Sequence, residues 1–383
     1  MYFGKSRKGS SGFLQKRHKI FTNIHSKIYP RRYNEYYKLN TVVGIVSRDI
    51  TRRDFLKRST AAGVLTTVAL SGVEKVAAET EVGVEKGTVI DLTVCDGCKN
   101  EAMPLCVSAC RLKNESRFPD PNPEDIQPYW PRKKFEDWSD KKDMINRLTP
   151  YNWTFIDRVE IEQDGKMEEV FVPRRCMHCD NPTCMNLCPF GAISKDSNGA
   201  VSIDDSFCMG GAKCRDACPW DIPQRQAGVG LYLKVAPDLA GGGVMYKCDF
   251  CADLQKQGKE PACVTSCPKN AITFGTKEEM KRYAYERAEE ISGYVYGDKE
   301  NGGTATFYVS KVPFEKINEA IKKDKQNKMD QKPGRPTMEV GMENKLDSFT
   351  GMMQSAMLAP IAGAVTAGVV AYRTMKGEKK DEE

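Results

Sequence analysis

All fifteen cysteines of this 383-residue chain lie between Cys95 and Cys267, in four runs with similar internal spacing. The runs are Cys95-x2-Cys98-x7-Cys106-x3-Cys110, Cys176-x2-Cys179-x4-Cys184-x3-Cys188, Cys208-x5-Cys214-x3-Cys218 and Cys248-x2-Cys251-x11-Cys263-x3-Cys267. Three of the four runs end in Cys-Pro. A Cys-x2-Cys pair places two thiolates on one metal centre, whereas Cys-x3-Cys-Pro sends its last thiolate to a second centre. The spacing therefore predicts iron–sulfur clusters.

Three other interpretations of the cysteines are weaker. Structural zinc also uses Cys-x2-Cys pairs, but a zinc ribbon needs two such pairs and has no trailing Cys-x3-Cys-Pro. A disulfide framework is typical of small secreted chains with an even number of cysteines, and this chain is long with an odd number. Unrelated core cysteines would not repeat one spacing four times.

Four runs indicate two ferredoxin modules, because in a two-cluster module the fourth cysteine of each run crosses to the other cluster. The expected fold is α+β, with duplicated 2[4Fe–4S] ferredoxin-like modules and insertions. The pattern resembles the four-cluster electron-transfer subunits of membrane-bound respiratory enzymes. These include the beta subunits of formate dehydrogenase, dimethyl-sulfoxide reductase and nitrate reductase, and the hydrogenase-2-type ferredoxin subunit, which the chain resembles from end to end.

This resemblance implies which cysteines share a cluster, since in the family the outer runs pair with each other and the inner runs pair with each other. The first set is Cys95, Cys98, Cys106 and Cys267; the second set is Cys248, Cys251, Cys263 and Cys110; the third set is Cys176, Cys179, Cys184 and Cys218; the fourth set is Cys208, Cys214 and Cys188. The fourth set lacks one cysteine.

The missing cysteine of the fourth set corresponds to Gly211, because the family has a second cysteine three residues after the first one of this run. Three thiolates suit a [3Fe–4S] cluster, so we predict three [4Fe–4S] clusters and one [3Fe–4S] cluster. Any fourth ligand would be solvent or another group. Asp205 and Asp216 are near in sequence, but acids beside such loops are usually solvated.

Two other residues near the runs have open roles. Arg111 follows Cys110, where the other runs have proline, and it either shifts the potential of a nearby cluster or is an ordinary surface arginine. His178 lies between Cys176 and Cys179. It either donates to a cluster sulfide, acts at a quinone site, or is a surface loop residue, and the last interpretation is favoured.

Residues 1–78 are expected to be a basic extension and a twin-arginine signal peptide. Residues 51–57 (Thr-Arg-Arg-Asp-Phe-Leu-Lys) match an export signal, and an apolar stretch at 61–73 precedes a small-residue cleavage site at 76–78. Residues 1–58 have a net charge of +12, so the rest of the chain sums to −6. An over-long gene start, with initiation near 42–46, is favoured over a basic arm for nucleic acid or membrane.

Residues 348–372 contain no charge and are expected to form a transmembrane anchor, since an apolar run of this length spans about 30 Å as a helix. Small residues recur at four-residue spacing, which allows close helix packing. The basic residues of 373–383 suit a cytoplasmic tail. The alternative is a buried or amphipathic helix, because the run is rich in Ala and Gly. The exported domain is then expected on the periplasmic side of the cytoplasmic membrane.

The four-cluster domain is expected over residues 79–275, with insertions at 111–175 and 219–247, followed by an extension and linker at 276–346. Short strands are predicted at 89–92, 200–203, 271–274 and 304–312, a hairpin on Asp164-Gly165, a helix over 277–291 and a polar linker over 325–344. Trp130, Trp138 and Trp153 are expected in the core of the first insertion, and the Gly-rich segment 228–243 as a loop near a subunit interface.

The sequence shows no catalytic arrangement and no molybdopterin or flavin signature, which favours an electron-transfer subunit. The expected partners are a catalytic oxidoreductase subunit (a nickel–iron hydrogenase or a molybdopterin enzyme) and an integral membrane quinone-reactive or cytochrome subunit. No nucleic-acid partner is expected. Two alternatives are a stand-alone reductase that uses the three-cysteine cluster and a structural or assembly protein. No sequence feature favours either alternative.

Overall fold

The computed structural model describes residues 83–128, 135–163, 165–235, 242–328 and 332–348, with isolated positions up to 357. The signal peptide, Trp130, the cytoplasmic tail and most of the anchor expected at 348–372 lie outside the described residues. Within the described ranges, no helix is both long enough and apolar enough to cross a membrane.

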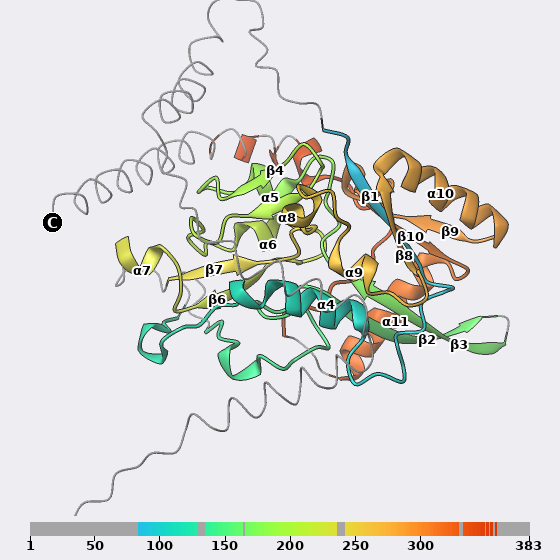
Figure 1. Ribbon diagram of the computed structural model, residues 1–383, viewed down its shortest axis with the longest axis horizontal. Helices are drawn as coiled ribbons and strands as arrows, with labels where there is room; N and C mark the ends of the chain where they lie inside the picture. Colours follow the sequence, from blue (N-terminus) through green and yellow to red (C-terminus); the bar gives the residue numbers. More distant parts are fainter. Residues whose placement is uncertain are drawn as a thin grey trace, which may run out of the picture. The chain divides into compact units, whose positions relative to one another are not determined.

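A four-stranded sheet supports one end of the described body (Figure 1). Its strands, in the order β8-β1-β10-β9, are β8 (Ile272–Thr276), β1 (Lys86–Asp91), β10 (Thr306–Ser310) and β9 (Tyr294–Tyr296). Strand β1 pairs parallel with β10 and antiparallel with β8. The sheet thus joins the two ends of the cysteine-bearing region, since β1 precedes the first run and β8 follows the last.

Helix α10 (Lys277–Glu290) covers one face of this sheet. It begins at a capping box, in which the Thr276 hydroxyl accepts from the backbone N–H of Glu279 and the Glu279 carboxylate accepts from the backbone N–H of Thr276. Its buried Ala284 and Ala288 pack against Val89 and Phe307 of the sheet. The small side chains let the helix approach the strands closely.

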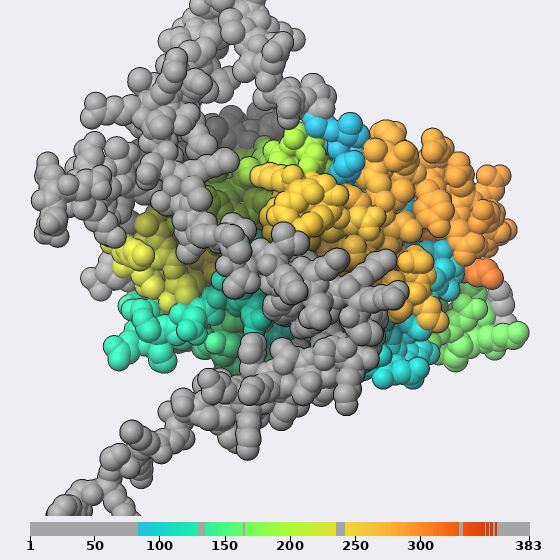
Figure 2. All heavy atoms as spheres, in the orientation of Figure 1, coloured from blue at the N-terminus to red at the C-terminus, as the bar shows by residue number. Residues whose placement is uncertain are grey.

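The other face of the sheet belongs to the main hydrophobic core, which includes seven of the cysteines. A hairpin of β2 (Phe155–Gln163) and β3 (Lys166–Arg174) enters this core, and its tip stands at the edge of the molecule (green in Figure 2). The pairing of Gln163 with Lys166 confirms the turn at 164–165, and Gly165 has a φ of +72°. Helix α11 (Phe314–Asn327) packs on β2.

Short elements carry and surround the cysteines. The helices are α4 (Leu105–Asn114), α5 (Thr183–Asn186), α6 (Lys213–Ala217), α7 (Tyr232–Val235), α8 (Ala252–Gln255) and α9 (Ala262–Thr265). Two hairpins pair β4 (Ile193–Lys195) with β5 (Val201–Ile203) and β6 (Gln224–Ala227) with β7 (Gly243–Tyr246). Single 3-10 turns are η1 (Glu115–Arg117), η2 (Pro123–Asp125), η3 (Ser139–Lys141), η4 (Glu300–Gly302) and η5 (Lys345–Asp347).

Cys-Pro ends each of three runs in the same way. The residue three positions after the cysteine has a left-handed backbone: Gly191 (φ +63°), Asp221 (φ +49°) and Asn270 (φ +52°). Gly, Asp and Asn tolerate this conformation best. The first run has no proline after Cys110, and there α4 continues to Asn114. The recurrence is structural evidence for the expected duplication.

Several predictions for the remaining segments are confirmed and one is wrong. The strands at 89–92, 200–203, 271–274 and 304–312 and the helix from Lys277 appear within a few residues, and Trp138 and Trp153 are buried. The expected linker at 325–344 instead packs on the body, where Met338 is fully buried and Asn344 nearly so. The Gly-rich segment 228–243 connects β6 to β7, as expected for a loop, and includes the one-turn helix α7; residues 236–241 lie outside the described residues, and the expected subunit interface stays a prediction.

Candidate iron–sulfur centres

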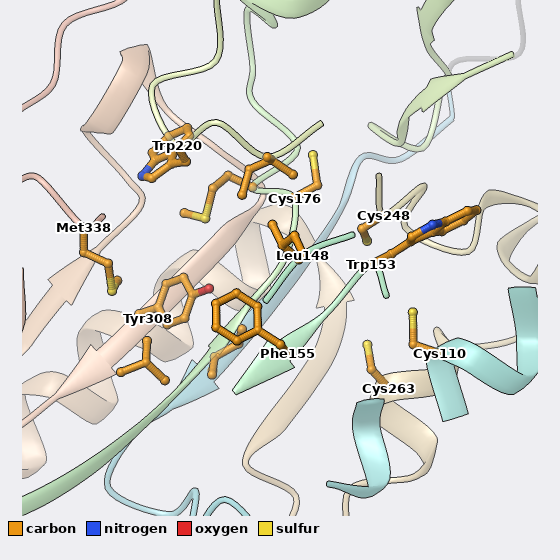
Figure 3. Packing of buried hydrophobic residues seen from close by; sticks show 14 of the residues in the cluster. Cys110, Leu148, Trp153, Phe155, Cys176, Trp220, Cys248, Cys263, Tyr308 and Met338 are labelled. Atoms are coloured by element: carbon orange, nitrogen blue, oxygen red, sulfur yellow. The ribbon is translucent and has the colours of Figure 1, made fainter. Parts of the chain in front are cut away.

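The four cysteines of the second set line one cavity with about 320 Å³ of empty space. Cys110 comes from α4, Cys263 from α9, and Cys248 and Cys251 from the loop before α8. Figure 3 shows the sulfur atoms of Cys110, Cys248 and Cys263 turned towards one space, whereas the sulfur of Cys176 points to the other side. A cavity lined by four thiols fits a cubane, which needs one thiolate at each iron corner.

The three cysteines of the fourth set line a second cavity, with about 280 Å³ of empty space. Gly211, where the family has a cysteine, lies in the same wall. A Cβ at Gly211 would lie 2.8 Å from the ring of Phe190. The Phe190 ring therefore occupies the side on which a fourth thiolate would enter, which suits a three-iron cluster.

The cysteines of the first and third sets are also neighbours. Burial, together with the charges of Cys267 and Cys98, raises the pKa of Cys95 to about 11. Burial also raises the pKa of Cys106, with smaller contributions from Cys95, Cys98 and Cys267. In the third set, burial and then Cys176, Cys218 and Cys184 raise the pKa of Cys179. The structure thus brings together the members of all four implied sets.

Four helices connect these sets in pairs. Helix α4 carries Cys106 of the first set and Cys110 of the second, one turn apart, and it packs against α9, which carries Cys263 and leads to Cys267. In the inner module α5 and α6 pack in the same way, with Cys184 and Cys214 as their second residues. Each cysteine helix therefore serves two neighbouring sets.

Successive sets are neighbours, and this order from the first set to the fourth is called the line of sets below. Electrostatic neighbours across set boundaries are Cys106 with Cys263, Cys248 with Cys176, and Cys214 with Cys184. These pairs link the first set to the second, the second to the third, and the third to the fourth. The described residues contain no group of three His, Cys, Asp or Glu side chains placed to hold a single metal ion.

Three buried cations lie beside three of the four sets. Burial raises the pKa of the thiols, and a cation opposes this rise: Arg175 for Cys248 and Cys263, Lys247 for Cys184, and Arg225 for Cys208. Arg175, Lys247 and Arg225 are each at most 5% exposed. The charged side chains beside Cys98 of the first set are instead acids, Asp96 and Glu101.

The expectation that His178 is a surface loop residue is wrong. Its side chain is fully buried, stacks on Phe250 at 4.5 Å between ring centroids, and places Nε2 3.5 Å from the Cys248 Sγ. Burial, followed by the charges of Lys247 and Arg175, lowers the pKa of His178 well below its ordinary value. A neutral ring in this position can donate one hydrogen bond to a thiolate.

Sequence reasoning missed the three cations. Arg175 and Lys247 each stand directly before the first cysteine of a run, and this adjacency could have identified them. Arg225 has no such signal, because β6 brings it to Gly210 through a hydrogen bond to the Gly210 carbonyl. The Arg111 guanidinium donates to the carbonyls of Tyr151 and Lys142, which leaves both of its proposed roles open.

The acid Asp205 is not simply solvated, since its carboxylate accepts from Arg117 Nε at 3.0 Å. Arg117 also pairs with Asp249 at 2.6 Å, next to Cys248. The main-chain carbonyl of Asp216 accepts from Lys345 Nζ at 2.7 Å. Neither carboxylate lines the cavity of the fourth set.

Two models of the 4Fe-4S dicluster domain match the chain, at residues 94–192 and 167–277. The hydrogenase-2 operon protein HybA of Escherichia coli O157:H7 is 30% identical over 307 residues, which cover 70% of this chain and 83% of that protein. The formate dehydrogenase iron-sulfur subunit of Haemophilus influenzae is 32% identical over 253 residues, which cover 64% of this chain and 71% of that subunit.

The formate dehydrogenase-O iron-sulfur subunit of Escherichia coli K12 is 36% identical over 232 residues, or 59% of this chain. The matched part is 66% of that subunit, just under two thirds of its length. These similarities confirm the expected tandem dicluster architecture. The chain belongs to the family of iron–sulfur subunits built from 4Fe-4S dicluster domains.

Proposed function

We propose that the chain is an electron-transfer subunit that relays electrons through three [4Fe–4S] clusters and one [3Fe–4S] cluster, held by the four sets. The observation that carries this proposal is that each set is a neighbour of the next. Helix α4 carries cysteines of the first and second sets, His178 beside Cys179 lies 3.5 Å from the Cys248 Sγ, and α5 of the third set packs against α6 of the fourth. When bound, the clusters would supply one-electron oxidation and reduction, one cluster losing the electron that the next one gains.

The contribution of the protein is to hold, space and bury these centres. Eight of the fifteen cysteines are buried, and seven of those eight lie in the main hydrophobic core. Mostly buried residues line the cavities of the second and fourth sets, and the cations beside three sets would compensate part of the negative charge of thiolate-bound iron.

We propose two partners, one at each end of the line: a catalytic oxidoreductase subunit and an integral membrane quinone-reactive or cytochrome subunit. The names of the similar proteins, formate dehydrogenase iron-sulfur subunits and a hydrogenase-2 operon protein, support a molybdopterin enzyme or a nickel–iron hydrogenase as the catalytic partner. The same relatives give no reason to choose between the two.

We also propose export by the twin-arginine route and anchoring through residues 348–372, on the periplasmic side of the cytoplasmic membrane. The segment that leads to the proposed anchor packs on the inner module, since Leu346 contacts Leu187 and Ala217 and Lys345 donates to the Asp216 carbonyl. These residues flank the cysteines of the third and fourth sets. An anchor that begins at 348 would therefore hold the fourth-set end of the line towards the membrane.

Co-purification tests the proposed partners. The full chain is isolated from membranes with mild detergent, and the bound subunits are identified. We expect one cofactor-bearing catalytic subunit and one integral membrane subunit, at equal stoichiometry with the chain. Isolation of the chain by itself from freshly solubilised membranes, with its iron intact, would contradict the proposal.

Rapid-mixing kinetics on the purified complex test the relay. Cys263→Ser removes a ligand from the second set and should slow electron transfer between the catalytic and membrane subunits at least tenfold. Thr265→Ser, an exposed position on the same helix α9, is the matched control and should leave the rate unchanged. Equal rates in both variants would show that electrons bypass this chain.

A further inference from the structure

Two buried side chains from the segment of the third set reach cysteines of the second set. Arg175 and His178 flank Cys176, which belongs to the third set together with Cys179. Arg175 nevertheless lines the cavity formed by Cys110, Cys248, Cys251 and Cys263. His178 lies 3.5 Å from the Cys248 Sγ through its Nε2 atom. One segment therefore holds one centre through its cysteines and faces the next centre through its other side chains.

The hydrogen-bonding direction of His178 follows from its surroundings. The backbone N–H of Val201 donates to Nδ1 at 3.1 Å, so Nδ1 carries no proton and the ring proton lies on Nε2. Stacking on Phe250, with 17° between the ring planes, fixes the plane of the imidazole. The N–H of Nε2 is thus aimed at the Cys248 sulfur, and the buried ring has no solvent to turn towards.

Arg175 brings a full positive charge to the same cavity. Its Nη2 donates to the Thr88 hydroxyl, and its guanidinium lies 5.5 Å from the centre of the Phe250 ring. Its Nε and Nη1 are buried and donate to no nitrogen or oxygen atom of the described residues. Buried N–H groups are nearly always satisfied. The Cys248 thiol is already a side-chain hydrogen-bond partner of the guanidinium, and the sulfur atoms of a cluster bound in this cavity would supply further acceptors.

We propose that Arg175 and His178 are positioning residues of the third-set segment that raise the reduction potential of the cluster bound by the second set. The inference rests on the proposed electron-transfer function. A reduced cluster is more negative than an oxidised one, so a fixed cation and an N–H donor to its thiolate stabilise the reduced form. His178 also connects the two modules, because it contacts Cys248 through Nε2 and is joined to Cys179 by a peptide bond.

Paired variants in the full chain separate donor and charge from packing. His178→Phe keeps a flat ring against Phe250 but removes the donor, whereas His178→Gln retains an N–H group. Arg175→Met removes the charge at similar length, whereas Arg175→Lys retains it. Arg225→Met is the matched control, since it removes a buried cation that faces Cys208 of the fourth set. Cys263→Ser identifies the resonance of the second-set cluster.

The measurement is a redox titration of each variant, followed by electron paramagnetic resonance. We expect His178→Phe and Arg175→Met each to lower the midpoint potential of the second-set cluster by at least about 59 mV. For a one-electron couple this shift is a tenfold change in the ratio of oxidised to reduced cluster at a given potential. His178→Gln and Arg175→Lys should change the ratio of oxidised to reduced second-set cluster by less than threefold. Arg225→Met should shift the three-cysteine centre and leave the second-set cluster unchanged.

An unchanged second-set potential in His178→Phe, with full iron content, would overturn the inference, as would equal shifts of all four clusters. Should Arg175→Met fail to assemble, the His178→Phe and His178→Gln pair decides the question by itself, since both variants keep the charge. Absence of iron from the wild-type chain would instead refute the proposed function, so the two failures are distinguishable.

Discussion

The first and fourth cysteine sets, at the two ends of the line, belong to two similar modules but lie in different surroundings. At the first set, Cys95, Cys98 and Cys267 are only partly buried, and the neighbouring charges are the acids Asp96 and Glu101. At the fourth set, Cys208 and Cys214 are buried, and Arg225 faces Cys208. The two sets thus differ in burial and in neighbouring charge as well as in their number of cysteines.

This difference has a functional meaning, because hydrogen bonds, net charge and solvent exposure set the potential of a cluster. Acids at the first set favour the oxidised form, whereas a buried cation and a missing thiolate at the fourth set favour the reduced form. We therefore expect the fourth-set cluster to have the higher potential, so that electrons that enter at the first set move downhill towards the fourth.

The largest expected effect comes from restoring the missing ligand with Gly211→Cys. The backbone at Gly211 does not require glycine, and the new Cβ would displace only the ring edge of Phe190, 2.8 Å away. We expect the three-iron signal of the oxidised protein to disappear and the potential of this centre to fall. Iron analysis and electron paramagnetic resonance measure both.

Gly211→Ser is the control for this substitution, since it adds similar bulk without a thiolate and should keep the three-iron signal. Gly210→Cys is not a suitable alternative, because its φ is +67° and a Cβ there would lie 2.4 Å from the Gly243 carbonyl oxygen. Persistence of the three-iron signal in Gly211→Cys, at full cluster occupancy, would contradict the assignment of the fourth set.

Removal of iron by a chelator should destabilise the inner module more than the four-stranded sheet at the first-set end. In the described residues, the inner module has short helices and two-stranded hairpins, whereas the four-stranded sheet and α10 support the first-set end. Empty thiol cavities would also leave buried cations without anionic partners. We expect limited proteolysis of the chelated protein to cut first within 176–248 and later within 272–310. Simultaneous cleavage of both regions would show that the sheet has no independent stability.

Arg335→Met should destabilise the protein by about 3–5 kcal/mol, the usual cost of breaking a buried ion pair. Arg335 pairs with Asp157 of β2 at 2.7 Å and with Asp324 of α11 at 2.8 Å, and both Arg335 and Asp157 are almost fully buried. This pair fixes the segment that leads to the fourth-set end. Denaturant unfolding measures the loss, and exposed Lys316→Met on α11 should stay within about 0.5 kcal/mol of wild type.

The smallest expected effect is that of Asp96→Asn at the first set. The Asp96 side chain is 42% exposed and lies 3.3 Å from Lys269 Nζ, so solvent and a cation already weaken its charge. Asparagine keeps the acceptor for the backbone N–H of Cys98, which donates to Asp96 Oδ1 at 3.0 Å. Redox titration should show a small rise in the potential of the first-set cluster. The rise should be well below the shift that corresponds to a tenfold change in the ratio of oxidised to reduced cluster. If Asp96→Asn instead shifted the potential of the fourth-set cluster more than that of the first-set cluster, Asp96 would not act on the first set, which would contradict this account.

The elements that local chemistry determines were predictable from the sequence. The strands beside the runs, the hairpin on 164–165 and the capped helix from Lys277 each depend on adjacent residues. Surroundings built from distant segments were not predictable. His178 is buried by Phe250 and Val201, which lie 72 and 23 positions further along the chain. The expected linker packs because Met338 and Asn344 meet α11 and the loop at Asn301, contacts that a polar composition conceals.

Analysis of the oxidised wild-type chain tests the assignment of the four sets most directly. Iron and acid-labile sulfide are measured on the full chain, and electron paramagnetic resonance is recorded before any reductant is added. We predict about fifteen iron atoms per chain and a three-iron signal in the oxidised protein. About sixteen iron atoms without such a signal would contradict the three-cysteine centre, and fewer than about eight would contradict the four-cluster line itself.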